Sequence, residues 1–129
     1  MRLLLDSQAL LWFLLGSDDV FPGHVRDAVE DTRAHVVVSV ASQWELMIKA
    51  MNGRLQLPDA AEQFLIDLPR EAGFRVLDVQ PRHVAALVEL PQIHADPFDR
   101  MLVAQAMVED LDLVTDDEMI RRYPVRTMW

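Results

Sequence analysis

Residues 3–12 are LLLDSQALLW, the stretch with which the fold begins. The apolar run Leu3-Leu4-Leu5 is typical of a buried strand, and Asp6 ends it. Ser7–Leu15 then has the character of a helix. A strand that passes directly into a helix is the repeating unit of an α/β sheet. The stretch therefore predicts a buried strand with a carboxylate at its carboxyl end.

The same alternation continues along the chain. Further strands are predicted at Val36–Val40, Phe74–Val79 and Leu111–Val114, with a last strand from Val125. Helices are predicted at His24–Asp31, Ser42–Met51, Asp59–Leu68 (which Pro69 should end), Arg82–Leu90, Pro97–Glu109 and Asp116–Arg121. Strands that alternate with helices imply a mainly parallel sheet of four to five strands joined by right-handed crossovers.

Composition restricts the possible classes of protein. A chain of 129 residues with 51% hydrophobic residues is expected to form one domain, residues 1–129, with a substantial core. It contains no cysteine, which excludes disulfides, a cysteine nucleophile and the usual structural zinc site. The apolar stretch Ala9–Leu15 is too short to span a membrane. We therefore expect a cytoplasmic protein that does not enter a membrane.

Four acidic residues lie near the predicted strand-to-helix junctions: Asp6, Glu45, Asp99 and Asp117. Each of them also has a structural explanation. Ser42 and Glu45 have the spacing of a capping box, and Asp96 before Pro97 is a favoured helix N-cap. Thr115 is a similar N-cap, followed by an acidic first turn. Taken singly, each acid is explained by helix capping.

Taken together, the four acids favour a metal site. The carboxyl ends of parallel strands meet at one edge of a sheet, where ligands bind. Carboxylates gathered there without cysteine or clustered histidine match hard cations such as Mg²⁺ or Mn²⁺. Phosphodiester hydrolysis is the chemistry that such a site serves best, because a metal polarises the phosphate and activates water.

The basic residues and the histidines leave alternatives open. Lys49 follows Glu45 by four residues, so it either forms a helical salt bridge or meets a phosphate. Arg100 either contacts a phosphate or pairs with Asp96. The four histidines share no ligand spacing, and we expect them at the surface. The net charge of −9 counts against generic nucleic-acid binding, so any contact with a nucleic acid would depend on local arginines.

Four segments resemble PIN-domain proteins, and most closely VapC-type toxins of the subgroup paired with Phd/YefM-like antitoxins. They are LLLDSQALLW (3–12), SVASQWELMIK (39–49), HADPFDRMLVAQA (94–106) and LVTDD (113–117). The likeness runs in order along the whole chain, and its most specific part is the block around residues 96–106. Two departures occur: Gln8 stands where histidine is frequent in this subgroup, and Asp116 stands where a basic residue is frequent.

The resemblance implies a three-layer α/β/α domain and an Mg²⁺- or Mn²⁺-dependent endoribonuclease, the toxin of a type II toxin–antitoxin pair. Its partners would be RNA and a cognate antitoxin, and it would commonly be a homodimer. The acidic quartet of the family corresponds to Asp6, Glu45, Asp99 and Asp117, with Asp116 as the alternative fourth ligand.

Two other classes of function are compatible with the residues. One is a catalytically inactive PIN-like module that binds a metal or a partner, in which the acids cap helices. The intact quartet counts against this module, and the net charge favours it. The other is a phospho-acceptor or phosphatase domain. It ranks last, because no Asp-x-Asp motif follows the first strand.

Overall fold

The computed structural model describes residues 1–17 and 19–129. Within these residues, β1 (Arg2–Leu5) lies in the middle of a five-stranded sheet with the order β3-β2-β1-β4-β5. The other strands are β2 (His35–Ser39), β3 (Arg75–Leu77), β4 (Asp112–Val114) and β5 (Thr127–Met128). Every pairing between these strands is parallel, which confirms the predicted α/β sheet.

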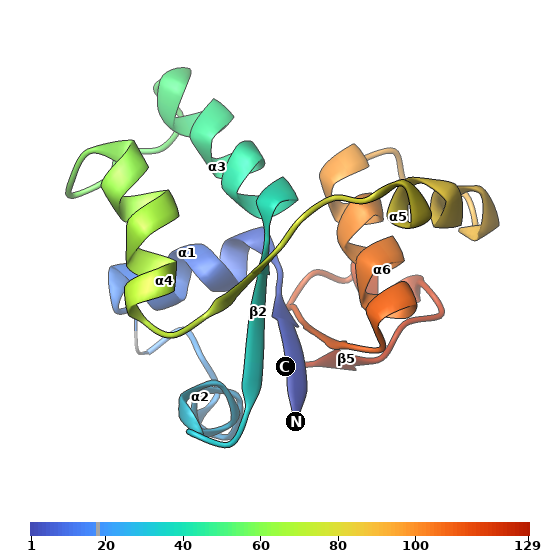
Figure 1. Ribbon diagram of the computed structural model, residues 1–129, viewed down its shortest axis with the longest axis horizontal. Helices are drawn as coiled ribbons and strands as arrows, with labels where there is room; N and C mark the ends of the chain where they lie inside the picture. The colour runs from blue at the N-terminus through green and yellow to red at the C-terminus, as the bar shows by residue number, and fades with distance from the viewer. Residues whose placement is uncertain (18) are drawn as a thin grey trace.

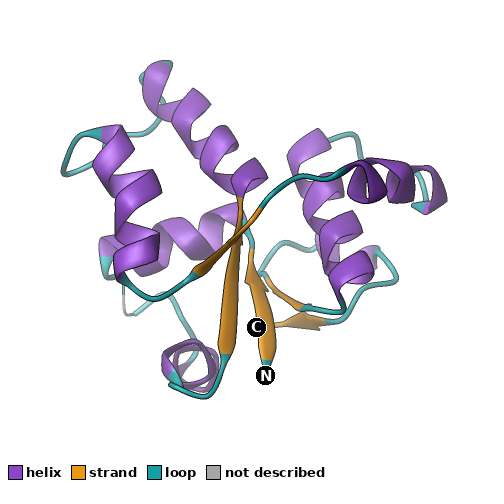
Figure 2. Ribbon diagram, in the orientation of Figure 1, coloured by secondary structure: helices purple, strands orange, loops and turns teal. Residues whose placement is uncertain are grey.

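Helices cover both faces of the sheet (Figure 1, Figure 2). They are α1 (Ser7–Leu15), α2 (Gly23–Glu30), α3 (Val40–Met51), α4 (Leu68–Glu71), α5 (Pro81–Ala86) and α6 (Pro97–Glu109). A π-helical turn, η1 (Gln63–Asp67), and two 3-10 turns, η2 (Leu87–Glu89) and η3 (Ile120–Arg122), complete the helical segments of the described chain. In Figure 1, α1 to α4 lie to one side of the strands and α5 and α6 to the other.

The central strand divides the core into two clusters. Leu3 and Leu5 pack into the cluster that also contains residues of α1, α2 and η1. Leu4 points the opposite way, into the cluster that contains residues of α6, β4 and η3. All three leucines are fully buried, as expected of a strand covered on both faces. The result is a three-layer α/β/α architecture.

The strand order places a crevice beside β1. The chain runs from β1 outwards through β2 to β3 and then returns to the other side of β1 as β4. In such sheets, ligands bind outside the carboxyl ends of the strands at this switch in direction. Here β1 and β4 are joined at that end, because the amide of Asp6 donates to the carbonyl of Val114 at 3.0 Å.

The start of α3 differs from the prediction. The helix begins at Val40, because the Ser39 hydroxyl accepts the Ala41 amide at 3.0 Å and acts as the N-cap. The predicted capping box of Ser42 and Glu45 is therefore wrong. Ser42 lies inside the helix, fully buried, and its hydroxyl has no hydrogen-bond partner among the described residues. Glu45 consequently lies in the second turn of α3.

The predicted helix end at Pro69 is also wrong, since Pro69 lies within α4, directly after η1. Proline lacks the N–H that an α-helix would direct to the carbonyl four residues earlier. That carbonyl, on Leu65, instead accepts the side-chain amide of Gln43 at 3.1 Å. The wider π-helical turn and this bond from α3 together accommodate the proline.

The remaining elements differ in smaller ways. The predicted helix at 116–121 is wrong, because only the short turn η3 forms there and Asp116 precedes it as an exposed residue. The predicted helix at 82–90 divides into α5 and η2. Within residues 1–17 and 19–129, none of the helices combines the length and the apolar character needed to cross a lipid bilayer.

Candidate metal centre at the carboxyl ends of the strands

Asp6 is held at the junction between β1 and α1. Its Oδ1 accepts the Ala9 amide at 2.7 Å, so the carboxylate caps α1, and its side chain is nearly inaccessible to solvent. The Thr115 hydroxyl, at the end of β4, also hydrogen-bonds this carboxylate. Asp6 is thus a buried carboxylate with a fixed position, and helix capping alone does not require that burial.

Asp117 follows β4 and approaches the same point. Its amide donates to the Thr115 hydroxyl at 3.0 Å. Its own Oδ1 accepts the amides of Met119 at 2.8 Å and Ile120 at 3.1 Å. Asp117, and not the predicted Thr115, therefore caps the turn, while Thr115 bonds to both Asp6 and Asp117.

Asp99 comes from the first turn of α6. The predicted cap is confirmed here: Oδ1 of Asp96 accepts the amides of Phe98 at 2.9 Å and Asp99 at 3.0 Å. The carboxylate of Asp99 remains available for other contacts. Its Oδ2 lies 3.0 Å from Nε2 of His94.

Glu45 reaches the site from α3. Its Oε2 lies 3.2 Å from Nζ of Lys49, which confirms the predicted helical salt bridge. Its Oε1 is buried and has no hydrogen-bond partner in the described part of the chain. A buried carboxylate oxygen without a partner is costly, so this atom is a candidate for contact with a cation.

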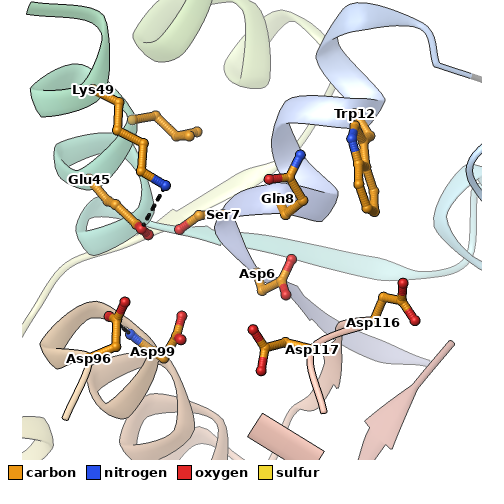
Figure 3. Close-up of a pocket in the computed structure, with 11 residues that line it drawn as sticks. Asp6, Ser7, Gln8, Trp12, Glu45, Lys49, Asp96, Asp99, Asp116 and Asp117 are labelled. Carbon is orange, nitrogen blue, oxygen red and sulfur yellow. Dashed lines mark hydrogen bonds and ion pairs between the residues drawn. The ribbon is translucent and has the colours of Figure 1, made fainter. Parts of the chain in front are cut away.

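These residues line one cavity of about 330 Å³ (Figure 3). Its lining comprises Asp6, Ser7, Gln8, Trp12, Glu45, Leu46, Lys49, Asp96, Asp99, Asp116 and Asp117. Figure 3 shows the acidic side chains arriving from the junction of β1 with α1, from α3, from the start of α6 and from the segment after β4. The structure thus brings all five acidic residues of the prediction, Asp116 included, to one cavity.

The field within the cavity is unfavourable to negative charge. Burial raises the pKa of Asp6 to about 6, and the charges of Asp99 and Asp117 add to the effect against the bonds from Thr115 and Ala9. The pKa of Asp99 is also raised to about 6, mainly by burial and then by the neighbouring carboxylates, although the bond from His94 lowers it. A cation would relieve both effects.

The acidic residues share a cavity and do not form a ready coordination sphere. Among the described residues, no three histidine, aspartate or glutamate side chains are placed to hold one ion. The chemistry of the donors nevertheless fits a hard divalent cation, since carboxylate oxygens are its preferred ligands. The partnerless Oε1 of Glu45 is one such oxygen.

Of the predicted basic residues, only Lys49 lines the cavity. The guanidinium of Arg100 donates to the Pro91 carbonyl at 2.9 Å and to the Tyr123 hydroxyl at 3.0 Å. Arg100 also lies over the Tyr123 ring, 5.8 Å from its centroid. The guanidinium of Arg100 thus binds Pro91, which precedes α6, and Tyr123 of the C-terminal segment.

Sequence reasoning missed several residues around the site. Ser7, Gln8 and Trp12 line the cavity, and the spacing of Gln8 and Trp12, one helical turn apart, was the only available signal. The expected surface position of the histidines is wrong for His83, which is fully buried. His94 has only 14% of its side chain exposed.

The sequence model of the PIN domain family matches residues 3–125. No curated protein matches the chain in sequence. Among solved structures, a chain of VapBC2 from Rickettsia felis, bound to a DNA fragment from their promoter, superposes with a TM-score of 0.73 at 15% identity. The alignment covers 99% of this chain and 98% of that one.

Two further solved structures share the fold. A chain of VapBC-1 from nontypeable Haemophilus influenzae gives a TM-score of 0.70 at 14% identity, covering 99% of this chain and 97% of that one. A chain of FitAB bound to an IR36 DNA fragment gives a TM-score of 0.59 at 17% identity, covering 98% and 93%. At these identities the likeness establishes the fold.

Proposed function

The chain belongs to the PIN domain family, and from this premise we propose that it is an Mg²⁺- or Mn²⁺-dependent endoribonuclease, the toxin of a type II toxin–antitoxin pair. The observation that carries the proposal is the cavity at the carboxyl ends of β1 and β4. It gathers carboxylates from four separate elements, and two of them, Asp6 and Asp99, have a raised pKa. Helix capping does not require carboxylates from four places in the chain to share one cavity or two of them to be buried, and this arrangement suits a bound cation.

Asp6, Glu45, Asp99 and Asp117 are the residues proposed to hold the ion. Asp117 is preferred to Asp116, because its charge raises the pKa of both Asp6 and Asp99. When bound, the ion would polarise the scissile phosphate and lower the pKa of the attacking water.

The protein groups have separate tasks in this proposal. Thr115 and the start of α1 hold Asp6 in place through hydrogen bonds. Lys49, with 44% of its side chain exposed beside the cavity, is placed to meet an RNA phosphate. The net charge of −9 repels RNA at long range, so local contacts of this kind must supply the affinity.

The partners are proposed on the same basis. The similarity to chains of VapBC2 and VapBC-1 and the motifs in the sequence support a cognate antitoxin, of the Phd/YefM type by the sequence resemblance. That antitoxin would inhibit by covering the acidic cavity, with an arginine against its carboxylates. We further propose a homodimer acting on cytoplasmic RNA.

Cleavage of RNA by the purified protein in Mg²⁺ or Mn²⁺ tests the proposal. EDTA and Asp99→Asn should both abolish cleavage. Asp59→Asn, at an exposed residue outside the cavity, is the matched control and should cleave like the wild type. Cleavage that survives Asp99→Asn contradicts the site. A folded protein that binds Mn²⁺ but cleaves no transfer, ribosomal or messenger RNA supports the inactive binding module.

A further inference from the structure

A chain of hydrogen bonds ends on Asp99. Nε2 of His94 lies 3.0 Å from Oδ2 of Asp99, and Nδ1 of the same imidazole lies 2.7 Å from the Tyr123 hydroxyl. The Tyr123 hydroxyl in turn accepts Nη1 of Arg100 at 3.0 Å. Tyr123 is 3% exposed, and His94 and Asp99 are largely buried, so water has little access to these bonds.

The chemistry of the groups fixes the direction of each bond. An ionised carboxylate only accepts, so Nε2 of His94 must carry the proton that it shares with Asp99. In a neutral imidazole the other nitrogen then accepts, and the Tyr123 hydroxyl donates to it. Arg100 donates to the Tyr123 oxygen, since a guanidinium has no acceptor. Along this chain each donor therefore points towards Asp99, although the Tyr123 hydroxyl also lies 3.5 Å from the His94 carbonyl.

We propose that Arg100, Tyr123 and His94 are positioning residues that orient the Asp99 carboxylate for a divalent cation. His94 engages Oδ2 and so restricts rotation of the carboxylate, which assigns Oδ1 to the ion. Partners of this kind fix the orientation of metal ligands and raise metal affinity. The inference rests on the proposed function, because it takes Asp99 as a ligand.

The chain also links two parts of the site. His94 precedes α6, while Tyr123 directly follows η3, whose first residue, Ile120, donates its amide to the Asp117 carboxylate. Tyr123 thus connects the segment that carries Asp117 to the carboxylate of Asp99. Arg100 acquires a role that differs from phosphate contact, as the donor at the beginning of the chain.

The imidazole tautomer gives a test that needs neither metal nor RNA. Nitrogen-15 NMR of the metal-free protein at neutral pH should show His94 with its proton on Nε2. In Tyr123→Phe, which removes one oxygen and keeps the ring, the proton should stay on Nε2 beside the Asp99 carboxylate, while the nitrogen-15 shift of Nδ1 should change because Nδ1 loses the Tyr123 hydroxyl donor. A neutral His94 with its proton on Nδ1 and none on Nε2 in the wild type would overturn the inference, because Nε2 could not then donate to Asp99.

Calorimetric titration of the same proteins with Mn²⁺ tests the positioning role. His94→Leu should weaken binding about 10–100-fold, the usual effect of losing such a partner. Tyr123→Phe should weaken it less, and His94→Gln, which retains an N–H donor, should restore part of the loss. The matched control is His83→Gln, because His83 is also buried but bonds to Gln80 and Glu109 outside the cavity.

The outcomes separate this inference from the proposed function. If Asp99→Asn loses Mn²⁺ binding but His94→Leu and Tyr123→Phe bind like the wild type, the positioning role is wrong and the site stands. If the wild type binds no Mn²⁺, the site is wrong and the inference fails with it. Melting curves of the metal-free variants identify any that do not fold, and Tyr123→Phe, the smallest change, then decides the question.

Discussion

Nζ of Lys49 lies 3.2 Å from one oxygen of Glu45, while the other oxygen of that carboxylate is buried and has no hydrogen-bond partner among the residues that the structure describes. Lys49 therefore contacts one oxygen of the Glu45 carboxylate and leaves the other available. A salt bridge between residues four apart on a helix contributes about 0.2–0.5 kcal/mol to the stability of the helix. The position of Lys49 beside the cavity is therefore more important for binding than this salt bridge is for stability.

Lys49→Met separates metal binding from RNA binding. Removing a positive charge next to the cavity should strengthen Mn²⁺ binding several-fold, because like charges repel. Cleavage should nevertheless fall, through a raised KM, if Lys49 meets an RNA phosphate. Calorimetry and cleavage kinetics measure the two effects, and the melting temperature should change little. Weaker Mn²⁺ binding together with unchanged KM would contradict this role.

Two substitutions of Asp6 distinguish its role as the N-cap of α1 from the effect of its negative charge. Asp6→Asn keeps an oxygen for the Ala9 amide and removes a buried charge, so the metal-free protein should melt no lower than the wild type. Asp6→Ala also loses the cap, at a cost of about 1 kcal/mol. Both variants should lose the rise in melting temperature that Mn²⁺ gives the wild type.

Thermal melts of the three proteins with and without Mn²⁺ check this. The assignment of Asp6 to the metal site fails if Asp6→Asn retains the full Mn²⁺-dependent rise. The matched control is Asp59→Asn, which should respond to Mn²⁺ like the wild type.

The raised pKa of Asp6 predicts how stability depends on pH. Between the ordinary value of 3.8 and about 6, the folded protein binds a proton that the unfolded chain releases. The metal-free protein should therefore become more stable as the pH falls from 7 towards 5. Asp6→Asn should have a flatter profile of melting temperature against pH. Parallel profiles for the two proteins would contradict the raised pKa.

Asp117→Asn and Asp116→Asn should differ in their effect on metal binding. The charge of Asp117 acts on both Asp6 and Asp99, whereas Asp116 is not among the causes of either raised pKa. Asparagine at 117 can still accept the amides of Met119 and Ile120, so the turn should survive. We expect Asp117→Asn to weaken Mn²⁺ binding more; the reverse order would make Asp116 the fourth ligand.

Much of the fold follows from local sequence. The apolar run of β1 and the Asp96-Pro97 start of α6 were both predicted correctly, since burial and capping are local signals. The start of α3 was not, because both Ser39 and Ser42 can cap a helix. The pairing of β2 with β3 extends to Ser39, which ends the strand there and places the cap at Ser39.

Some features of the candidate site could likewise be predicted from the sequence, and others could not. The gathering of the acids in one cavity was expected from the parallel sheet, and their roles as ligands stay predictions. The bond between His94 and Tyr123 joins residues 29 positions apart, and no local pattern indicates it. The burial of His83 was missed for the same reason, because its partner Glu109 lies on α6.

The amide of Gln43 that serves the Leu65 carbonyl makes two distant positions depend on each other. A residue other than proline at position 69 would bring its own N–H and compete with Gln43 for that carbonyl. Gln43 lies two residues before Glu45, on the same helix, so a change in its bonding would alter how α3 is seated against η1. The effects of substitutions at 43 and 69 on stability should therefore be non-additive. A substitution of Pro69 would also shift the carboxylate of Glu45.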